Sequence, residues 1–174
     1  MTVKSVGDKV PRVAPTAWIS EAAYVVGDVE IGEGSSVWPG AVVRGDFGSI
    51  RIGADTVIED NCVVHTGEPM WIGDHDIIGH NVIVHCGRIG SRCLIGSGSI
   101  LLDGVVIGDL CLVAAGSLVL GGVTVPERSF VYGSPGVIEP ISDRHLKMLE
   151  GFGRHTDQER GYSMMARLYR DAGL

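Results

Sequence analysis

The chain has 174 residues, enough for one domain with a hydrophobic core, and no shift in composition marks a second domain. Its formal net charge of -7 is spread along the sequence without a basic cluster, which argues against nucleic acid or an anionic membrane surface as partner. Glycine supplies 26 residues and aromatic residues only 6%, so the backbone must turn often around an aliphatic core.

The N-terminal segment, MTVKSVGDKVPRV, has no apolar stretch like that of a secretory signal, and no run of 18 apolar residues occurs. We therefore expect a cytoplasmic protein. The cysteines Cys62, Cys86, Cys93 and Cys111 form no CxxC pair and are expected to be buried free thiols. The last two lie 18 residues apart, and we expect them to stack inside the fold without forming a disulfide.

An aliphatic residue recurs every six residues from Val25 to Val131, and glycine often follows it, as in IGEGSS, IGADTV and IGSGSI. The phase slips within VRGDFGSIRIG, again at the loop GEPMW, and by one residue between Val84 and Ile89. The repeating aliphatic positions are Val25, Ile31, Val37, Val43, Ile52, Ile58, Val64, Ile72, Ile78, Val84, Ile89, Ile95, Leu101, Ile107, Val113, Val119, Val125 and Val131.

A unit of six residues is too short for a helical hairpin, but it fits one short strand followed by a turn. Three such units close one triangular coil, and successive coils stack at the parallel strand spacing of about 4.8 Å. The period therefore predicts an all-β, single-stranded parallel β-helix of hexapeptide repeats over residues 1–140.

The pattern changes in residues 141–174, where apolar residues recur at helical spacing. We expect two α-helices packed on the β-helix, with Ser142 as an N-cap and a break near Gly151 and Gly153. The residues expected to face the β-helix are Leu146, Leu149, Phe152, Met165, Leu168 and Tyr169. His145 and His155 are expected to be solvated.

Three histidines occupy related places in the repeat. His65 and His85 directly follow the third inward aliphatic of consecutive coils, so they should stack. His80 lies on the preceding face, up to roughly 16 Å from His85 along the chain. Two zinc–nitrogen bonds of about 2.1 Å cannot close that gap. We therefore expect a homotrimer in which a neighbouring subunit supplies the third ligand to each of three metal sites.

Three neutral imidazoles leave an open coordination position, which is typical of catalytic zinc sites, and Co²⁺ or Fe²⁺ could take the same ligands. The alternative is that each histidine is simply a polar residue on an exposed face. His75 lies on a turn of the repeat and does not stack with another histidine, so it is not counted among the expected metal ligands.

Charged residues occupy the same positions as these histidines in neighbouring coils, so each should stack in a column with them. Arg44 lies in the column of the two stacked histidines, one coil earlier, and Asp60 lies in the column of the third. These charged residues have two possible roles. Arg44 and Asp60 could form an ion pair between neighbouring subunits, or the charged side chains could take part directly in catalysis. Asp46 and Glu59 lie close to them in sequence.

The strings VVRGDFGSIRIG, IEDNCVVH, IGHNVIVHCG, LDGVVIG and YGSPG resemble the gamma-class carbonic anhydrases and relatives described as ferripyochelin-binding proteins or hexapeptide transferases. The resemblance covers roughly residues 14–140, and the tail helices fit it. RGD followed by a histidine and then HxxxxH is specific, whereas the hexapeptide repeat is shared with many acyltransferases.

The resemblance implies a left-handed β-helix trimer that binds zinc between subunits and hydrates carbon dioxide to bicarbonate. The positions that match the family are His65, His80 and His85 as metal ligands, with Arg44, Asp46 and Asp60 as its arginine and aspartates.

Two positions depart from the family pattern. Glu59 stands where the family usually has a glutamine that helps to orient the zinc-bound water. Some members carry a long acidic loop after the first histidine that relays protons, whereas this chain has only TGEPMW. Glu68 in that loop is either a reduced proton shuttle or an exposed turn carboxylate.

The leading hypothesis is zinc-dependent hydration of carbon dioxide, with Arg44, Asp46 and Glu59 arranging the surrounding hydrogen bonds. The alternatives are zinc-dependent hydrolysis of an acyl-CoA thioester, CoA-dependent acyl transfer, and a scaffold subunit without turnover. The three-histidine constellation disfavours acyl transfer.

Overall fold

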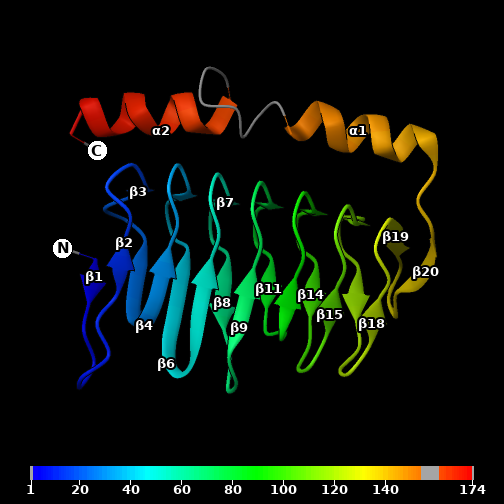
Figure 1. The fold of residues 1–174 in the computed structure, drawn as a ribbon, viewed down its shortest axis with the longest axis horizontal. Helices are drawn as coiled ribbons and strands as arrows, with labels where there is room; N and C mark the ends of the chain where they lie inside the picture. Colours follow the sequence, from blue (N-terminus) through cyan, green and yellow to red (C-terminus); the bar gives the residue numbers. More distant parts are fainter. Residues whose placement is uncertain (1, 154–160, 174) are drawn as a thin grey trace.

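The six-residue repeat forms one short strand and one turn per unit, and three strands complete each coil. The computed structural model describes residues 2–153 and 161–173. It is a β-solenoid of about 7 turns with two helices along one side, which confirms the predicted fold class (Figure 1). No helix among the described residues has both the length and the apolar character needed to cross a bilayer.

The strands stack into three faces, here called the first, second and third. The first face contains β1 (Val3–Lys4), the starts of β4 (Tyr24–Ile31) and β6 (Val42–Ile52), β8 (Val63–His65), β11 (Ile83–Val84), β14 (Ile100–Leu101) and β17 (Leu118–Val119). The second face contains β2 (Arg12–Val13), the ends of β4 and β6, β9 (Met70–Ile72), β12 (Arg88–Ile89), β15 (Val106–Ile107) and β18 (Thr124–Val125). Because β4 and β6 run through the corner between them, these two faces form one 12-stranded sheet.

The third face is a separate 8-stranded sheet. It contains β3 (Trp18–Ile19), β5 (Ser36–Val37), β7 (Val57–Ile58), β10 (Ile77–Ile78), β13 (Leu94–Ile95), β16 (Leu112–Val113), β19 (Ser129–Tyr132) and β20 (Val137–Pro140). All of its strands pair in parallel except β20, which runs antiparallel to β19.

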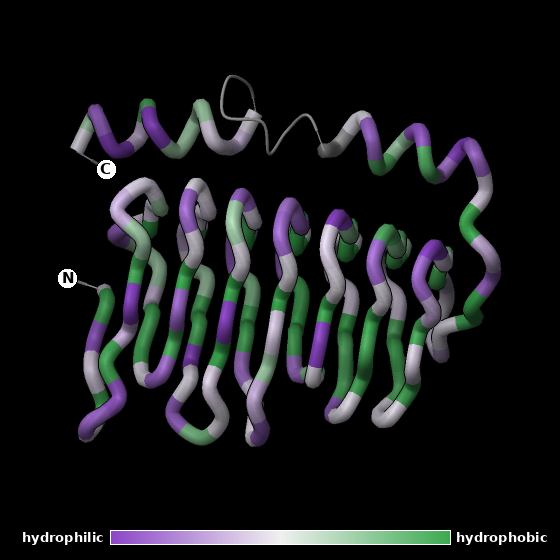
Figure 2. Tube along the Cα trace, in the orientation of Figure 1, coloured by the Kyte–Doolittle hydropathy of each residue, from purple (hydrophilic) through white to green (hydrophobic). Residues whose placement is uncertain are grey.

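The repeating aliphatic residues point inward and form the core. Each of the 18 positions in the predicted repeat is at most 3% exposed. Figure 2 shows hydrophobic residues recurring along every coil. The repeat also begins earlier than the sequence suggested, because Val13 pairs with Ile31 and Ile19 pairs with Val37 in the same register. These two residues are only half-buried, since no coil covers them from the N-terminal side.

The residues that point outward differ between the faces. On the first face they form an apolar ladder, Tyr24, Val42, Val63, Ile83, Ile100 and Leu118. On the second face the ladder is mostly polar, Glu30, Arg51, Trp71, Arg88, Val106 and Thr124. The outward residues of the third face pack against the two helices.

The helices α1 (Asp143–Gly153) and α2 (Gly161–Asp171) follow one another along the third face (Figure 1). Ser142 caps α1 as predicted, because its hydroxyl accepts a hydrogen bond from the backbone N–H of His145. Aromatic edge-to-face contacts hold α2, in which Tyr169 contacts the rings of Trp18 and Trp38 at centroid distances of 5.5 Å.

Part of the predicted helix packing is wrong. Leu149 is buried as expected, but Met165 and Leu168 are 37% and 53% exposed. The tryptophans on the third face admit the small Ala166 and the flat tyrosine rings, so α2 turns its larger aliphatic residues outward. His145 is half-buried rather than fully solvated, because one side of its ring packs on Phe130 at a centroid distance of 4.1 Å.

The side chain of Phe152 and the whole of His155 lie outside the described part of the chain. All four cysteines are buried free thiols, as predicted, and Cys93 and Cys111 lie in successive coils. Burial raises the pKa of Cys62 and that of Cys86 to about 12, so both stay protonated at neutral pH.

Candidate metal site at the edges of the first face

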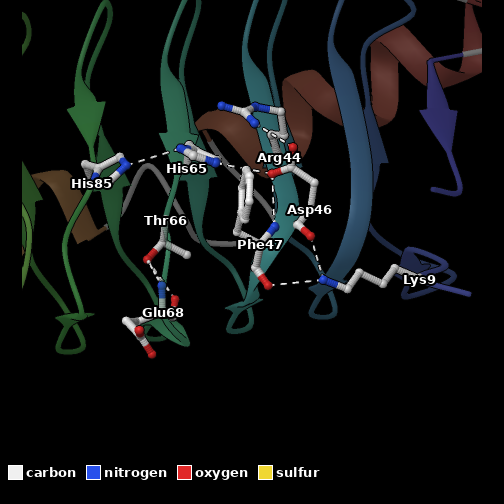
Figure 3. A network of polar contacts seen from close by, with 8 residues as sticks. All are labelled: Lys9, Arg44, Asp46, Phe47, His65, Thr66, Glu68 and His85. Carbon is white, nitrogen blue, oxygen red and sulfur yellow. Dashed lines mark hydrogen bonds and ion pairs between the residues drawn. The ribbon is translucent and has the colours of Figure 1, made fainter. Parts of the chain in front are cut away.

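Two of the predicted metal ligands lie side by side where the chain leaves the first face. His65 ends β8, His85 follows β11, and the register of these strands stacks them as the sequence predicts. Nδ1 of His65 lies 3.2 Å from Nε2 of His85 (Figure 3). Two imidazole nitrogens bound to one tetrahedral zinc are separated by roughly 3.4 Å, so this spacing suits a shared metal ion.

The second ring nitrogen of each histidine faces a carboxylate. Nε2 of His65 lies 3.2 Å from Oδ1 of Asp46, and Nδ1 of His85 lies 2.9 Å from Oδ1 of Asp103. A carboxylate that accepts this N–H fixes the tautomer and leaves the lone pair of the other nitrogen for a metal. Asp103 was missed by the sequence reasoning, although it lies in the string LDGVVIG that carried the resemblance.

Arg44 holds Asp46 in this position. It lies beside His65 in the pairing of β6 with β8, and its Nη1 is 2.5 Å from Oδ2 of Asp46. Burial alone raises the pKa of Asp46, but the hydrogen bond and charge of Arg44 outweigh it and lower this pKa below its ordinary value. The pKa of His65 is lowered, first by burial and then by the nearby charge of Arg44, which favours the neutral ring that metals bind.

The turn after Asp46 is fixed from two sides. Nζ of Lys9 donates to the carbonyl oxygens of Asp46 and Phe47, at 2.5 and 3.1 Å (Figure 3). Gly48 lies so close to the backbone of Glu68 that a side chain would not fit there. The Glu68 side chain is exposed, and its backbone N–H and C=O both bond the Thr66 hydroxyl, so this loop is an ordered turn.

The third predicted ligand, His80, lies at the opposite edge of the first face, in the turn where the chain enters it. Its Nδ1 is 3.2 Å from Oδ2 of Asp60, and its Nε2 is 3.2 Å from Oε2 of Glu59. Asp60 therefore occupies the column of His80, as predicted, and contacts it directly. His80 itself is half-exposed and available to a neighbouring molecule.

Glu59 is buried and has a second partner from the far end of the chain. The hydroxyl of Tyr162, on α2, donates a hydrogen bond to Oε1 of Glu59. Burial, followed by this hydrogen bond, raises the pKa of Tyr162 above its ordinary value, so the phenol remains a donor. Tyr162 was also missed by the sequence reasoning, because the two residues are 103 positions apart.

The predicted residues thus fall into two clusters. Arg44, Asp46, His65 and His85 form one, and Glu59, Asp60 and His80 form the other. Within residues 2–153 and 161–173, no three histidine, cysteine or acidic side chains converge on one point that could hold a metal ion. The inter-chain pair between Arg44 and Asp60 stays a prediction.

A cavity adjoins the second cluster. It has a volume of about 500 Å³ and lies between the third face and α2. Glu59, His80 and Tyr162 form its polar wall, while Leu94 and Met165 contribute apolar surface. A ligand in this cavity would contact the predicted third metal ligand directly.

Known proteins share both the repeat and the wider fold. The model of the family "Bacterial transferase hexapeptide (six repeats)" matches residues 87–121. A Methanocaldococcus jannaschii protein named "Probable carbonic anhydrase" is 47% identical over 135 residues, which are 76% of this chain and 85% of that protein. "Gamma carbonic anhydrase 1, mitochondrial" of Arabidopsis thaliana is 41% identical over 114 residues, or 61% of this chain.

The matched part of the Arabidopsis protein is 42% of its length, so this chain spans about two fifths of that relative. Among solved structures, a hexapeptide transferase family protein from Anaplasma phagocytophilum aligns with a TM-score of 0.82 and 35% identity. The alignment covers 91% of this chain and 92% of that one, so the likeness extends beyond the repeat.

Proposed function

Because this chain belongs to the hexapeptide-repeat family that includes gamma carbonic anhydrases, we propose that it is a metal-dependent enzyme that hydrates carbon dioxide to bicarbonate. The observation that carries the proposal is the facing pair of nitrogens on His65 and His85, each backed by a carboxylate. Zinc is the proposed metal, and Co²⁺ or Fe²⁺ suits the same nitrogen donors.

We place each metal between two subunits of a homotrimer. His65 and His85 would come from one chain and His80 from its neighbour. The apolar outward ladder of the first face supports this arrangement, because the histidines lie along its two edges and Val63 and Ile83 are about 40% exposed in the single chain. Burying that ladder against another copy would bring the edge of one chain to the opposite edge of the next.

The bound metal would supply a Lewis acid that lowers the pKa of a coordinated water to about 7. Around it, Asp46 and Asp103 hold the N–H of His65 and His85 on the side away from the facing nitrogens. Asp60 accepts from Nδ1 of His80 and leaves Nε2 as the nitrogen for the metal. Glu59 contacts that nitrogen in the single chain.

The test combines subunit mass, metal content and the rate of carbon dioxide hydration by stopped flow. We expect a trimer with one metal per subunit, and we expect the variants His65→Ala and His85→Ala to lose it. His75→Ala is the control and should keep its metal. A metal-free protein, or a monomer that retains all three histidine contacts, would contradict the proposal.

Subunit mixing tests the shared site. The variants His80→Ala and His85→Ala each lack one ligand, but a mixed trimer contains some sites with all three. We therefore expect the mixture to bind more metal than either parent. Equal metal binding by the mixture and both parents would rule out ligands drawn from two chains.

A second candidate is hydrolysis of an acyl-CoA thioester by the same site. The cavity of about 500 Å³ beside His80 favours it, because carbon dioxide needs no such volume whereas an acyl chain does. Thioester cleavage that saturates with substrate and is lost in His80→Ala would support this reaction. Acyl transfer and a scaffold role are less well supported, because neither requires His65 and His85 to face each other with a carboxylate at the second nitrogen of each ring.

A further inference from the structure

A second groove lies under α1, at the corner between the second and third faces. It has a volume of about 470 Å³. Its apolar lining comes from β10, β13, a turn of the β-helix and α1, namely Ile77, Leu94, Leu110, Leu146 and Leu149. Its size is within the range of small-molecule sites, roughly 300–1,000 Å³.

Two arginines line the same groove. Arg92 and Arg128 occupy equivalent turns, two coils apart, each in the left-handed backbone region with φ of 58° and 57°. Coils stack at about 4.8 Å, so the backbones of the two residues are roughly 10 Å apart, a gap that two arginine side chains can span. In the described part of the chain, neither guanidinium makes an ion pair.

The other titratable groups that line the groove are His75, Glu150 and the buried thiol of Cys93, which donates a hydrogen bond to the carbonyl oxygen of Gly108. His75 lies one coil before Arg92, and its Nδ1 is 4.0 Å from Oδ2 of Asp55. Glu150 projects from α1 and is exposed, without an ion pair among the described residues. Two guanidinium groups and one carboxylate line the groove, so the arginine side of the groove carries an excess of positive charge beside its apolar lining.

We propose that this groove binds a small amphipathic organic anion, with its carboxylate at Arg92 and Arg128 and its hydrocarbon tail on Leu94 and Leu149. Guanidinium groups bind carboxylates through paired charge-assisted hydrogen bonds, which neither arginine makes with residues 2–153 or 161–173. The apolar surface beside the arginines would bury a hydrocarbon chain, so the groove should prefer an anion with such a chain over a purely polar one. Because Ile77 and Leu94 also line the cavity beside His80, the tail would end near the predicted metal site.

The test uses octanoate as the probe and isothermal titration calorimetry on the full chain. We expect saturable binding to one site per chain. The double variant Arg92→Gln, Arg128→Gln should weaken the affinity by about tenfold or more, because charge-assisted hydrogen bonds are lost. Arg88→Gln is the matched control, since Arg88 lies on the second face away from the groove, and its affinity should be unchanged.

Two further measurements separate charge from apolar burial. Octan-1-ol has the same tail without the carboxylate and should bind at least tenfold more weakly than octanoate. Glu150→Gln removes the one opposing charge and should strengthen octanoate binding by a few fold. The proposal is overturned if octanoate does not bind, if the alcohol binds equally well, or if the double arginine variant keeps the original affinity.

Discussion

The first and second faces are built from the same repeat, yet their outward residues have opposite character. The second face presents Glu30, Arg51 and Arg88 to solvent, with ion pairs from Arg51 to Asp28 and Glu30 at 2.9 and 3.3 Å. The first face presents an unbroken column of Tyr, Val, Ile and Leu side chains. Since the inward residues are alike, the core does not require this difference, and it supports the proposal that the first face is the one that packs against another copy of the chain.

The largest expected effect is therefore on assembly. Val63→Asp puts a carboxylate in the middle of the apolar ladder, where burial against a second copy would cost several kcal/mol without a partner charge. We expect the oligomer to dissociate and the metal to be lost with it. Light scattering coupled to size exclusion measures the mass, and elemental analysis measures the metal.

Val106→Asp is the matched control, because Val106 is the same residue in an outward position on the second face. There the carboxylate stays in water, and we expect the mass to remain that of the parent. If both variants keep the parent mass, the first face is not an interface. If both dissociate, the contrast between the two faces carries no information about assembly.

The next effect contrasts inward with outward positions on one face. Ile89 on the second face is 1% exposed, so Ile89→Ala leaves a cavity in the prism and should cost about 2–5 kcal/mol of unfolding free energy. Val106→Ala, one coil later and pointing outward, should cost less than about 1 kcal/mol. Urea unfolding followed by circular dichroism compares them, and equal losses would contradict the assigned orientation.

These contrasts were readable from the sequence because a period of six fixes both the strand and the direction of each side chain. The same period placed His85 beside His65 and Asp60 beside His80. The sequence did not reveal that the repeat starts before Val25, because the earlier units lack the glycine that follows the aliphatic residue in later units. Val13 and Ile19 are inward positions of the same six-residue repeat, but neither is followed by glycine.

The rest of the site depends on contacts that no local pattern encodes. Tyr162 reaches Glu59 only because α2 returns along the third face to the early coils. Helical spacing identified α2 as amphipathic but not which side faces inward, and the aromatic surface of Trp18 and Trp38 decided that. The grouping of charges around each histidine likewise required the fold.

A third prediction concerns a carboxyl group inside the prism. Asp76 is fully buried, and its Oδ1 accepts a hydrogen bond from the backbone N–H of Cys93 at 2.7 Å, whereas Oδ2 has no partner among the described residues. Burial raises the pKa of Asp76 well above its ordinary value. The folded state therefore keeps the proton at a pH where the unfolded chain has released it, and stability falls as pH rises above about 4.

Asp76→Asn keeps the acceptor for Cys93 and removes the ionisable group. We expect the variant to gain about 1–3 kcal/mol over the parent near pH 8 and much less near pH 4. Thermal unfolding at both pH values measures the difference, and Asp109→Asn, at a turn, is the control. A difference independent of pH would show that Asp76 does not carry a raised pKa in the folded state.

The smallest expected effect concerns Glu59, which connects α2 to the edge of the first face. Its oxygens contact Nε2 of His80 and the hydroxyl of Tyr162, so a negative charge lies beside the proposed site. A nearby negative charge raises the pKa of groups that lose a proton during catalysis. Glu59→Gln should therefore raise carbon dioxide hydration a few fold near neutral pH and shift its pH profile downward by roughly one unit.

The control is Tyr162→Phe, which removes the hydrogen bond to Glu59 and leaves the charge. We expect its pH profile to stay near that of the parent, because the phenol is neutral throughout the range measured. Rates must be compared at matched metal occupancy. Superimposed profiles of the Glu59→Gln variant and the parent would mean that the charge does not act on the reacting group, while a loss of activity in that variant would indicate that Glu59 acts as a general base.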